Sequence, residues 1–344
     1  MSGSQPYLSI VIVGRNDNYG GDFTDRLQMC IDWNTRWLEE YKIESEIILV
    51  NWNPLVDQPD ITDQVAWPSG RKYVSYRILQ VPASVHEDYV DPEVRNTVPL
   101  FEFVAKNAGI RRAVGKYLLC MNADILVHPH ILKFISRKNL SDKVYYRANR
   151  LDFKKTKAES VESLFDAGFA VFLKGFMYYF EPESSVKWQY FKLKIRNRIR
   201  LRWEAFKLAH VDLSNSNQWN VVYHNGGYLA HCLASGDFML MNRNNWEKMR
   251  AYPEYTAIST HTDSLFTIMA YSLFKEKVLS APVFHQEHER RYGWEDIEKS
   301  EKFKRAYDLF ETAADDVKSG LGIEKYMNDE NWGLGKYELE EIGL

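Results

Sequence analysis

The sequence predicts an α/β fold, in which a mainly parallel sheet is flanked by helices and the second half carries a helical insertion. Two observations lead to this prediction. Short apolar runs of strand length alternate with segments of helical periodicity over residues 7–150. Short connections rich in glycine, asparagine and proline separate them, as in doubly wound sheets. A chain of 344 residues with 45% hydrophobic content suits one large domain, or a domain with a substantial insertion.

Three strands are expected in the first hundred residues. The first covers residues 7–13, which are apolar and β-branched, and it ends in a glycine-bearing loop. The next two cover residues 46–50 and 73–81, and the segment 57–71 between them is expected to be loop because it is rich in proline and aspartate. A helix after the first loop is expected from apolar positions at Leu27, Ile31, Trp37 and Leu38.

The segment 102–127 joins a helix, a buried strand and a carboxylate at fixed spacing. The helix is expected to stop at Gly115, and a short apolar strand to follow over residues 117–121. This strand ends at Asn122 and Asp124. In an open α/β sheet, an acid at the carboxyl end of a strand lies in the crevice where ligands bind.

This segment, opened by Lys106 and Asn107 and closed by Asn122-Ala123-Asp124, resembles the GT-A glycosyltransferases, particularly their family-2-like group. In that family the closing motif is Asp-X-Asp, and it holds a divalent cation against the diphosphate of a sugar nucleotide. Here Asn122 offers only a neutral carbonyl oxygen in place of the first acid. The resemblance implies a GT-A, Rossmann-like sheet and a Mn²⁺ or Mg²⁺ ion bound by Asp124; the alternative is that Asp124 caps a turn.

The resemblance also implies a nucleotide site formed by the loops that follow the first two strands and by the helix that carries Lys106 and Asn107. Trp52 is a candidate to stack on the base, and the alternative is a structural turn. Lys106 is either a phosphate contact or a solvated helix charge, and Arg111 and Arg112 are expected to be solvated. The nucleotide-binding candidates are Gly14, Arg15, Asn16, Asn51, Asn53, Lys106, Asn107 and Asn122.

Two acids are candidates for the catalytic base. After an apolar strand that begins beyond Gly236 and a short helix, Asp263 opens another helix with an apolar face. By resemblance, an acid at this point accepts the proton of the attacking hydroxyl, which requires a carboxylate within hydrogen-bond reach of that oxygen. Asp263 is the first candidate and Asp237 the second. The alternative is that Asp263 or Thr262 caps the helix.

Two histidines spaced by three residues follow an apparent strand near residue 285. His285 or His288 could bind the cation together with Asp124, because imidazole is a common metal ligand. The adjacent Arg290 and Arg291 are candidates to neutralise the diphosphate leaving group. Structural histidines are the alternative.

A basic segment in the middle of the chain matches no part of the GT-A pattern. Residues 188–207 combine an aromatic and aliphatic helical stripe with six lysines and arginines between residues 192 and 202, which suits an anionic membrane surface. A core helix with a solvated basic face is the alternative. The net charge of −3 gives no general bias toward nucleic acid, so no nucleic-acid partner is expected.

The chain is expected to be cytoplasmic, with peripheral membrane contact through residues 188–207 as an addition. Its first residues lack the basic start and long apolar run of a signal peptide, and no stretch of 18 uninterrupted apolar residues occurs. Cys30, Cys120 and Cys232 are expected to be reduced.

The resemblance covers roughly residues 7–150 and 230–295, and it divides the chain into four parts. These are a nucleotide-sugar-binding subdomain at 1–150, an insertion at 151–230 that contacts membrane or acceptor, an acceptor-binding and catalytic subdomain at 231–300, and a C-terminal helical extension and tail at 301–344.

The activity expected from the resemblance is transfer of a sugar from a nucleoside diphosphate sugar, a UDP-sugar first, to a hydroxyl of a glycan or glycolipid. We expect inversion at the anomeric carbon, with a metal ion assisting. Three alternatives stay open: a retaining transferase on the same fold, a sugar-phosphate nucleotidyltransferase, and a non-catalytic glycan-binding protein. Gly14 to Gly21 fits the glycine-rich loop of a nucleotidyltransferase poorly.

Overall fold

A computed structural model describes residues 5–92, 98–153, 230–232, 234–255, 261–289 and 301–344. The expected insertion at 151–230, with its segment 188–207, lies almost wholly outside the described residues, as do Arg290 and Arg291.

The predicted fold class is confirmed, because the described residues form one nine-stranded α/β sheet in which six strands point the same way. The strand order is β5-β8-β6-β7-β4-β1-β2-β3-β9, and only β5, β7 and β9 run in the opposite direction. The strands are β1 (Leu8–Gly14), β2 (Ser45–Trp52), β3 (Val74–Val81), β4 (Tyr117–Cys120), β5 (Ile125–Val127), β6 (Val144–Phe153), β7 (Met239–Asn242), β8 (Lys275–Gln286) and β9 (Glu340–Gly343).

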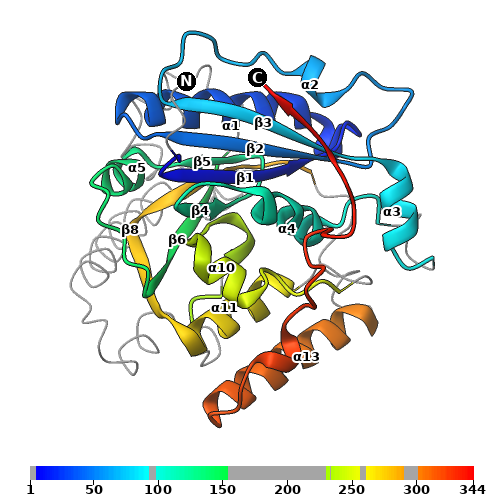
Figure 1. The fold of residues 1–344 in the computed structure, drawn as a ribbon, viewed down its shortest axis with the longest axis vertical. Helices are drawn as coiled ribbons and strands as arrows, with labels where there is room; N and C mark the ends of the chain where they lie inside the picture. The colour runs from blue at the N-terminus through cyan, green and yellow to red at the C-terminus, as the bar shows by residue number, and fades with distance from the viewer. Residues whose placement is uncertain (1–4, 93–97, 154–229, 233, 256–260, 290–300) are drawn as a thin grey trace, which may run out of the picture.

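Helices cover both faces of the sheet (Figure 1). The α-helices are α1 (Phe23–Glu40), α2 (Ile61–Gln64), α3 (Ala83–Tyr89), α4 (Glu102–Arg112), α5 (Pro129–Ile135), α10 (Arg243–Met249), α11 (Thr262–Leu273) and α13 (Glu301–Lys318). Short 3₁₀ turns are η1 (Tyr19–Gly21), η3 (Ser235–Asp237) and η4 (Glu324–Tyr326).

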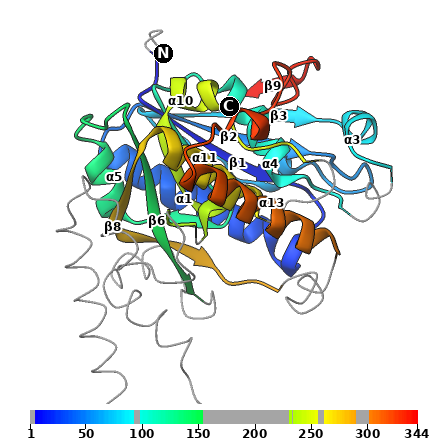
Figure 2. The same cartoon turned by 90° about the horizontal axis from the view of Figure 1, so that it is seen from below.

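The first strand shows why the sheet is buried on both sides. Ile10 and Ile12 pack into one core with α1 and α5, whereas Val11 and Val13 pack into a second core with α4, α10 and α11. Successive side chains of a strand point to opposite faces, so a strand covered on both faces reads as a continuous apolar run. Helix α13 packs against α11 on the second side (Figure 2).

Helix α4 lies very close to the sheet. A Cβ atom added at Gly109 would come within 2.6 Å of Val11 Cγ1 and 3.0 Å of Val50 Cγ2. The absence of a side chain at Gly109 therefore allows the helix backbone to approach β1 and β2, and this fixes the position of Lys106 one turn earlier.

The strand order has a switch point between β1 and β4, and this is where the crevice of an open α/β sheet is expected. The chain moves from β1 to β2 on one side and returns to β4 on the other, so the loops after β1 and β4 diverge at this point. Ligands of open α/β sheets bind outside the carboxyl ends of the strands at such a switch point. We call the edge where β1, β2, β3 and β4 end the carboxyl edge. Because β7 runs in the opposite direction, the η3 turn that precedes it lies at the same edge.

The C-terminal part of the chain returns to the sheet. After α13 it passes α4 and adds β9 antiparallel to β3 (Figure 1). Arg111 donates to the carbonyls of Glu330 and Trp332, and Arg112 donates to the carbonyls of three residues between 333 and 337. Arg111 is exposed, as expected, whereas Arg112 is partly buried, and both side chains hold this segment against α4.

Within the described part of the chain, the helices are too short or too polar to cross a bilayer. Cys30, Cys120 and Cys232 are free thiols, as expected.

Candidate functional site

Asp124, His285 and His288 meet at the carboxyl edge, and we call them the Asp–His cluster. Asp124 follows β4 and immediately precedes β5, and β5 pairs with β8, which places Ile125 opposite His285. One potential ligand atom from each of the three residues lies within 4.8 Å of the others. The sequence prediction that a histidine lies opposite Asp124 thus agrees with the geometry, and both histidines are present.

The Asp124 carboxylate is buried and charged. Burial raises its pKa, but the hydrogen bond from His288 and the positive charges of His285 and Arg26 lower the pKa to about 2. Its Oδ2 atom lies 2.8 Å from Arg26 Nη1, 3.3 Å from His288 Nε2 and 3.7 Å from His285 Nε2. Its Oδ1 atom is buried and has no hydrogen-bond partner among the described residues. A buried acceptor without a partner is costly, and it is a feature of a place that a ligand completes.

The η1 turn covers one side of this cluster. Tyr19 packs edge-on against the His288 ring at 5.2 Å between ring centres. Gly20 has a φ of 76°, and a Cβ atom there would come within 2.8 Å of Arg26 Nη2 and 3.0 Å of His288 Nδ1. The glycine-bearing loop after β1 therefore contacts the Asp–His cluster directly.

A second polar network lies beside Asn122. Lys106 is fully buried and donates to Glu102, to Asn122 Oδ1 at 2.5 Å and to the Gly236 carbonyl at 2.9 Å. Asn122 in turn donates to Asp237 Oδ1 at 2.8 Å. Asn122 thus links α4 to the η3 turn.

Asp237 is the last residue of the η3 turn, and Asp263, in the first turn of α11, contacts the first two residues of η3. Asp237 is buried and its Oδ2 atom pairs with Arg150 at 2.9 Å. Asp263 is half-buried, and its Oδ2 atom accepts hydrogen bonds from the Ser235 hydroxyl and the Gly236 N–H, both at 2.8 Å. Its Oδ1 atom accepts from the N–H of Ser264. Asp263 thus ties the start of α11 to η3, next to the Lys106 network.

The loops after β1 and β2 join at the other side of the crevice. Arg15 donates to the Asn53 carbonyl at 2.7 Å and pairs with Asp17. The Asn16 side chain accepts from the Leu55 N–H and donates to the Leu55 carbonyl and to two further carbonyls, so it fastens the two loops together. A side chain at Gly14 would come within 2.9 Å of Phe23 and Ile61, so this glycine is required by packing.

Asn51, Trp52 and Asn107 have mainly internal contacts. Trp52 is fully buried and donates to His86, so the expectation that it stacks on a base is wrong in this structure. Asn51 is fully buried and donates to Asp60 and Gln80, and its Oδ1 atom has no partner within the described chain. The Asn107 side chain binds the backbone of Tyr252 on the α4 side of the sheet.

Arg26 is the residue that sequence reasoning missed. It lies in α1, 98 positions before Asp124, and its side chain is 1% exposed. The only local signal is Asp22 four positions earlier, which forms an i,i+4 pair with it. Such a pair is common on helix surfaces, so it gave no indication that the arginine is buried.

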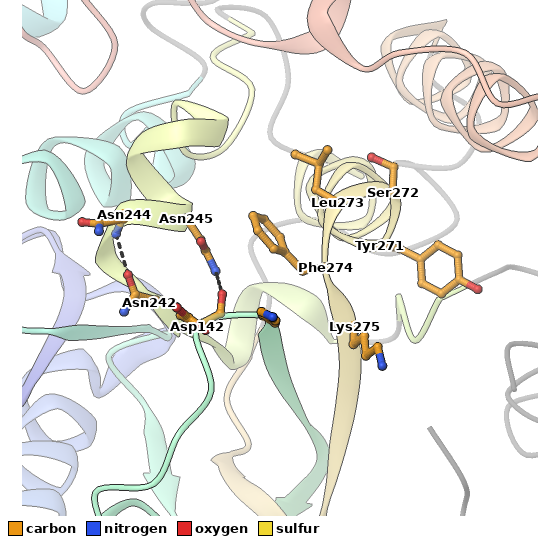
Figure 3. Close-up of a pocket in the computed structure, with 10 residues that line it drawn as sticks. Asp142, Asn242, Asn244, Asn245, Tyr271, Ser272, Leu273, Phe274 and Lys275 are labelled. Atoms are coloured by element: carbon orange, nitrogen blue, oxygen red, sulfur yellow. Dashed lines mark hydrogen bonds between the residues drawn. The ribbon is translucent and has the colours of Figure 1, made fainter. Parts of the chain in front are cut away.

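A separate hollow of about 560 Å³ lies at the opposite edge of the sheet. Figure 3 shows Asn242 bonded to Asn244 and Asn245 bonded to Asp142, across from Phe274 and Lys275 where α11 meets β8. Lys275 begins β8 and Asp142 precedes β6, so the hollow lies at the edge where these strands begin. The Asp–His cluster lies at the edge where β8 ends, so the two places are separate.

The chain is similar to two solved structures at low identity. Residues 1–349 of TarS from S. aureus are 13% identical with a TM-score of 0.44, and the match covers 89% of this chain and 64% of that one. The mannosyltransferase PcManGT from Pyrobaculum calidifontis, in complex with GDP-Man and Mn²⁺, is 10% identical with a TM-score of 0.39, covering 92% and 74%. The chain thus spans less than two thirds of the first structure. No protein-family model and no curated protein matches it. Neither similarity is high enough to assign the chain to a family.

Proposed function

We propose that this chain is a glycosyltransferase that moves a sugar from a nucleoside diphosphate sugar to a hydroxyl of a glycan or glycolipid. The observation that carries the proposal is the Asp–His cluster at the carboxyl edge, beside the crevice between β1 and β4. A buried carboxylate oxygen without a partner in that cluster supports a bound cation. A diphosphate bound in the crevice is the expected anionic partner of such an ion.

The three residues of the Asp–His cluster would hold the ion. Mg²⁺ prefers oxygen ligands, whereas imidazole nitrogens suit transition ions, so Mn²⁺ is the better match of the two. When bound, the ion offsets the negative charge that develops on the departing diphosphate. Arg290 and Arg291, outside the described residues, are proposed to assist there.

The proposed chemistry is a single displacement with inversion. The acceptor oxygen forms a bond to the anomeric carbon while the bond from that carbon to the diphosphate oxygen breaks, and the diphosphate leaves with the electron pair. Asp263 is proposed to take the acceptor proton. A carboxylate offers about four lone-pair positions, and the hydrogen bonds that Asp263 accepts from Ser235, Gly236 and Ser264 occupy three of them. Asp237 is the second candidate.

The nucleotide is proposed to bind at the loops after β1 and β2. Arg15 lies at the end of β1 and touches Asn53, and Asn51 carries a buried acceptor at the end of β2. The donor is proposed to be a UDP-sugar. The acceptor contact and a peripheral position at a cytoplasmic membrane surface are proposed for residues 188–207.

A non-catalytic nucleotide-sugar-binding protein is the second candidate. It is favoured by the contacts of the two acids, since Asp237 is ion-paired with Arg150 and Asp263 already accepts three hydrogen bonds. Under this alternative, the protein binds a donor but releases no free sugar and forms no glycoside.

Donor turnover decides between the two. We would measure release of nucleoside diphosphate from UDP- and GDP-sugars with and without Mn²⁺, and donor binding by calorimetry. Asp263→Asn should lower turnover by about 10²-fold or more while donor binding persists, as expected for loss of a general base. Asp124→Asn should abolish the Mn²⁺ dependence.

The matched control is Asp142→Asn, an exposed acid at the opposite edge of the sheet. Its turnover should equal that of the unchanged protein. Donor binding without turnover in any metal would contradict the transferase proposal and support the binding protein. NMR of the product anomer separates inversion from retention.

A further inference from the structure

Arg26 carries the positive charge that lies closest to the Asp–His cluster. Its Nη1 atom contacts Asp124 Oδ2 at 2.8 Å, which is a charge-assisted hydrogen bond. The two histidine Nε2 atoms approach the same carboxylate oxygen at 3.3 and 3.7 Å. The oxygen that faces both imidazoles is therefore the oxygen that Arg26 already occupies.

The arginine is fixed in this place by further contacts. Its Nε atom pairs with Asp22 Oδ1 at 2.8 Å, and its Nη2 atom donates to the Tyr19 carbonyl. The side chain is 1% exposed and Gly20 lies directly against it. Moving a buried guanidinium away from two carboxylates would leave unpaired charges, which is costly. The charge thus stays beside Asp124.

A fixed positive charge opposes a second cation nearby. A divalent ion bound to Asp124 would share its only carboxylate ligand in the cluster with the guanidinium, in a buried place where charges are weakly screened. In addition, Asn122 supplies no second negative charge, since it is bonded to Lys106 and Asp237.

We propose that Arg26 lowers the affinity of the Asp–His cluster for a free divalent cation, so that the ion is held firmly only when a diphosphate adds its own anionic ligands. This inference rests on the proposed function. It assigns Arg26 a positioning and affinity-setting role without contact to the substrate. By linkage, the ion and the diphosphate strengthen each other's binding by the same factor.

The test is the Mn²⁺ affinity of the full chain, measured by electron paramagnetic resonance and calorimetry with and without UDP. Arg26→Gln keeps one hydrogen-bond donor toward Asp124 and removes the charge. It should bind free Mn²⁺ at least tenfold more tightly than the unchanged protein, and UDP should raise its Mn²⁺ affinity by a smaller factor. Arg26→Lys, which keeps the charge, should stay within about threefold of the unchanged protein.

A double variant keeps the test decisive if Arg26→Gln folds poorly. Arg26→Gln with Asp22→Asn leaves the net charge unchanged and removes the carboxylate that would lose its partner. Because Asp124, not Asp22, belongs to the cluster, this double variant should also bind Mn²⁺ more tightly. Lys138→Gln removes one charge from a surface pair with Glu44 and should leave Mn²⁺ affinity unaltered.

The inference would be overturned if Mn²⁺ bound no more tightly to either variant that carries Arg26→Gln than to the unchanged protein. It would also be overturned if Arg26→Lys increased the Mn²⁺ affinity as much as Arg26→Gln does. The outcome is separate from that of the proposed function. Tighter Mn²⁺ binding without any donor turnover would uphold the role of Arg26 and reject the transferase. Donor turnover by the unchanged protein, together with unchanged Mn²⁺ affinity in the Arg26→Gln variants, would support the transferase and reject the role of Arg26.

Discussion

Glu276 is a carboxyl group buried behind the loop that leads to Asp237. It is 3% exposed and accepts the backbone N–H of His231 with both oxygens, at 3.1 and 3.2 Å. Burial raises the pKa of Glu276 to about 7, against the lowering effects of Arg147 and His231. Arg147 donates to the carbonyls of His231, Ser235 and Phe238, so the same group of side chains holds the η3 turn in place.

The raised pKa predicts that the contribution of Glu276 to stability falls as pH rises. The folded protein retains the Glu276 proton above the ordinary carboxyl pKa of 4.5, whereas the unfolded chain loses it. The stabilisation is present below that value and is lost as pH rises through about 7. Glu276→Gln should remove this pH-dependent part of the unfolding free energy, which is on the order of 3 kcal/mol. Urea unfolding between about pH 5 and 8 measures it.

Glu338→Gln is the control, since Glu338 is exposed near the C-terminus. Its unfolding free energy should follow that of the unchanged protein at each pH. A Glu276→Gln protein with the same pH slope as the unchanged chain would contradict the assignment.

At single positions, the sequence indicates which polar residues reach the carboxyl edge but not what they do there. Asp124, His285 and His288 could be anticipated, because each lies at or beside the end of a strand. Asn16 has the same sequence context, yet its side chain fastens two loops. A hydrogen-bonding side chain after a strand can bind a ligand or another loop equally well. Its partner is distant in sequence, so the sequence alone does not show which of the two roles it has.

At the scale of elements, helix α4 was predictable and its distance from the sheet was not. Its apolar face and Gly115 indicate a helix followed by a strand, and α4 and β4 are found there. The close approach depends on Gly109 meeting Val11 and Val50 from two other strands. Such a contact leaves no periodic signal in the helix itself.

Gly109→Ala should destabilise the protein by about 1–3 kcal/mol, because the added methyl group overlaps the valine side chains and forces the helix outward. Chemical unfolding gives the value. Since α4 also carries Lys106, donor turnover should fall as well. Gly343→Ala, where a Cβ atom meets nothing within 4 Å, serves as the matched control and should change stability by less than about 0.5 kcal/mol. Equal stability of the two variants would argue against close packing.

For the whole molecule, the C-terminal segment binds parts that are far apart in sequence. The Asn328 side chain donates to the carbonyls of Arg250 and Tyr252 and accepts the N–H of Glu254. Residues 301–344, expected to be a helical extension and tail, contain helix α13 and strand β9. We call the segment between these two elements, which includes Asn328, the tether. Contacts over more than seventy positions have no local pattern, which is why sequence reasoning missed the tether and β9.

Asn328→Ala should lower the free energy of unfolding by about 2–3 kcal/mol, because it leaves the Glu254 N–H and the Arg250 carbonyl without this partner and removes one of two donors to the Tyr252 carbonyl. The urea midpoint measures this loss. Asn331→Ala is a control in the same segment, where Asn331 takes part through its backbone N–H and carbonyl. Similar midpoints for both variants would show that the tether contributes little.

The last strand also has a consequence for self-association. Among the described strands β9 pairs only with β3, so its other side is an outer rim of the sheet, where a strand from another copy could dock. β9 has four residues, and two of them, Glu340 and Glu341, carry negative charge. Glu341 is paired with Arg77, whereas a copy docked parallel and in register would place its own Glu340 beside the Glu340 of the first copy. The like-charge repulsion between these two carboxylates would discourage fibre-like stacking.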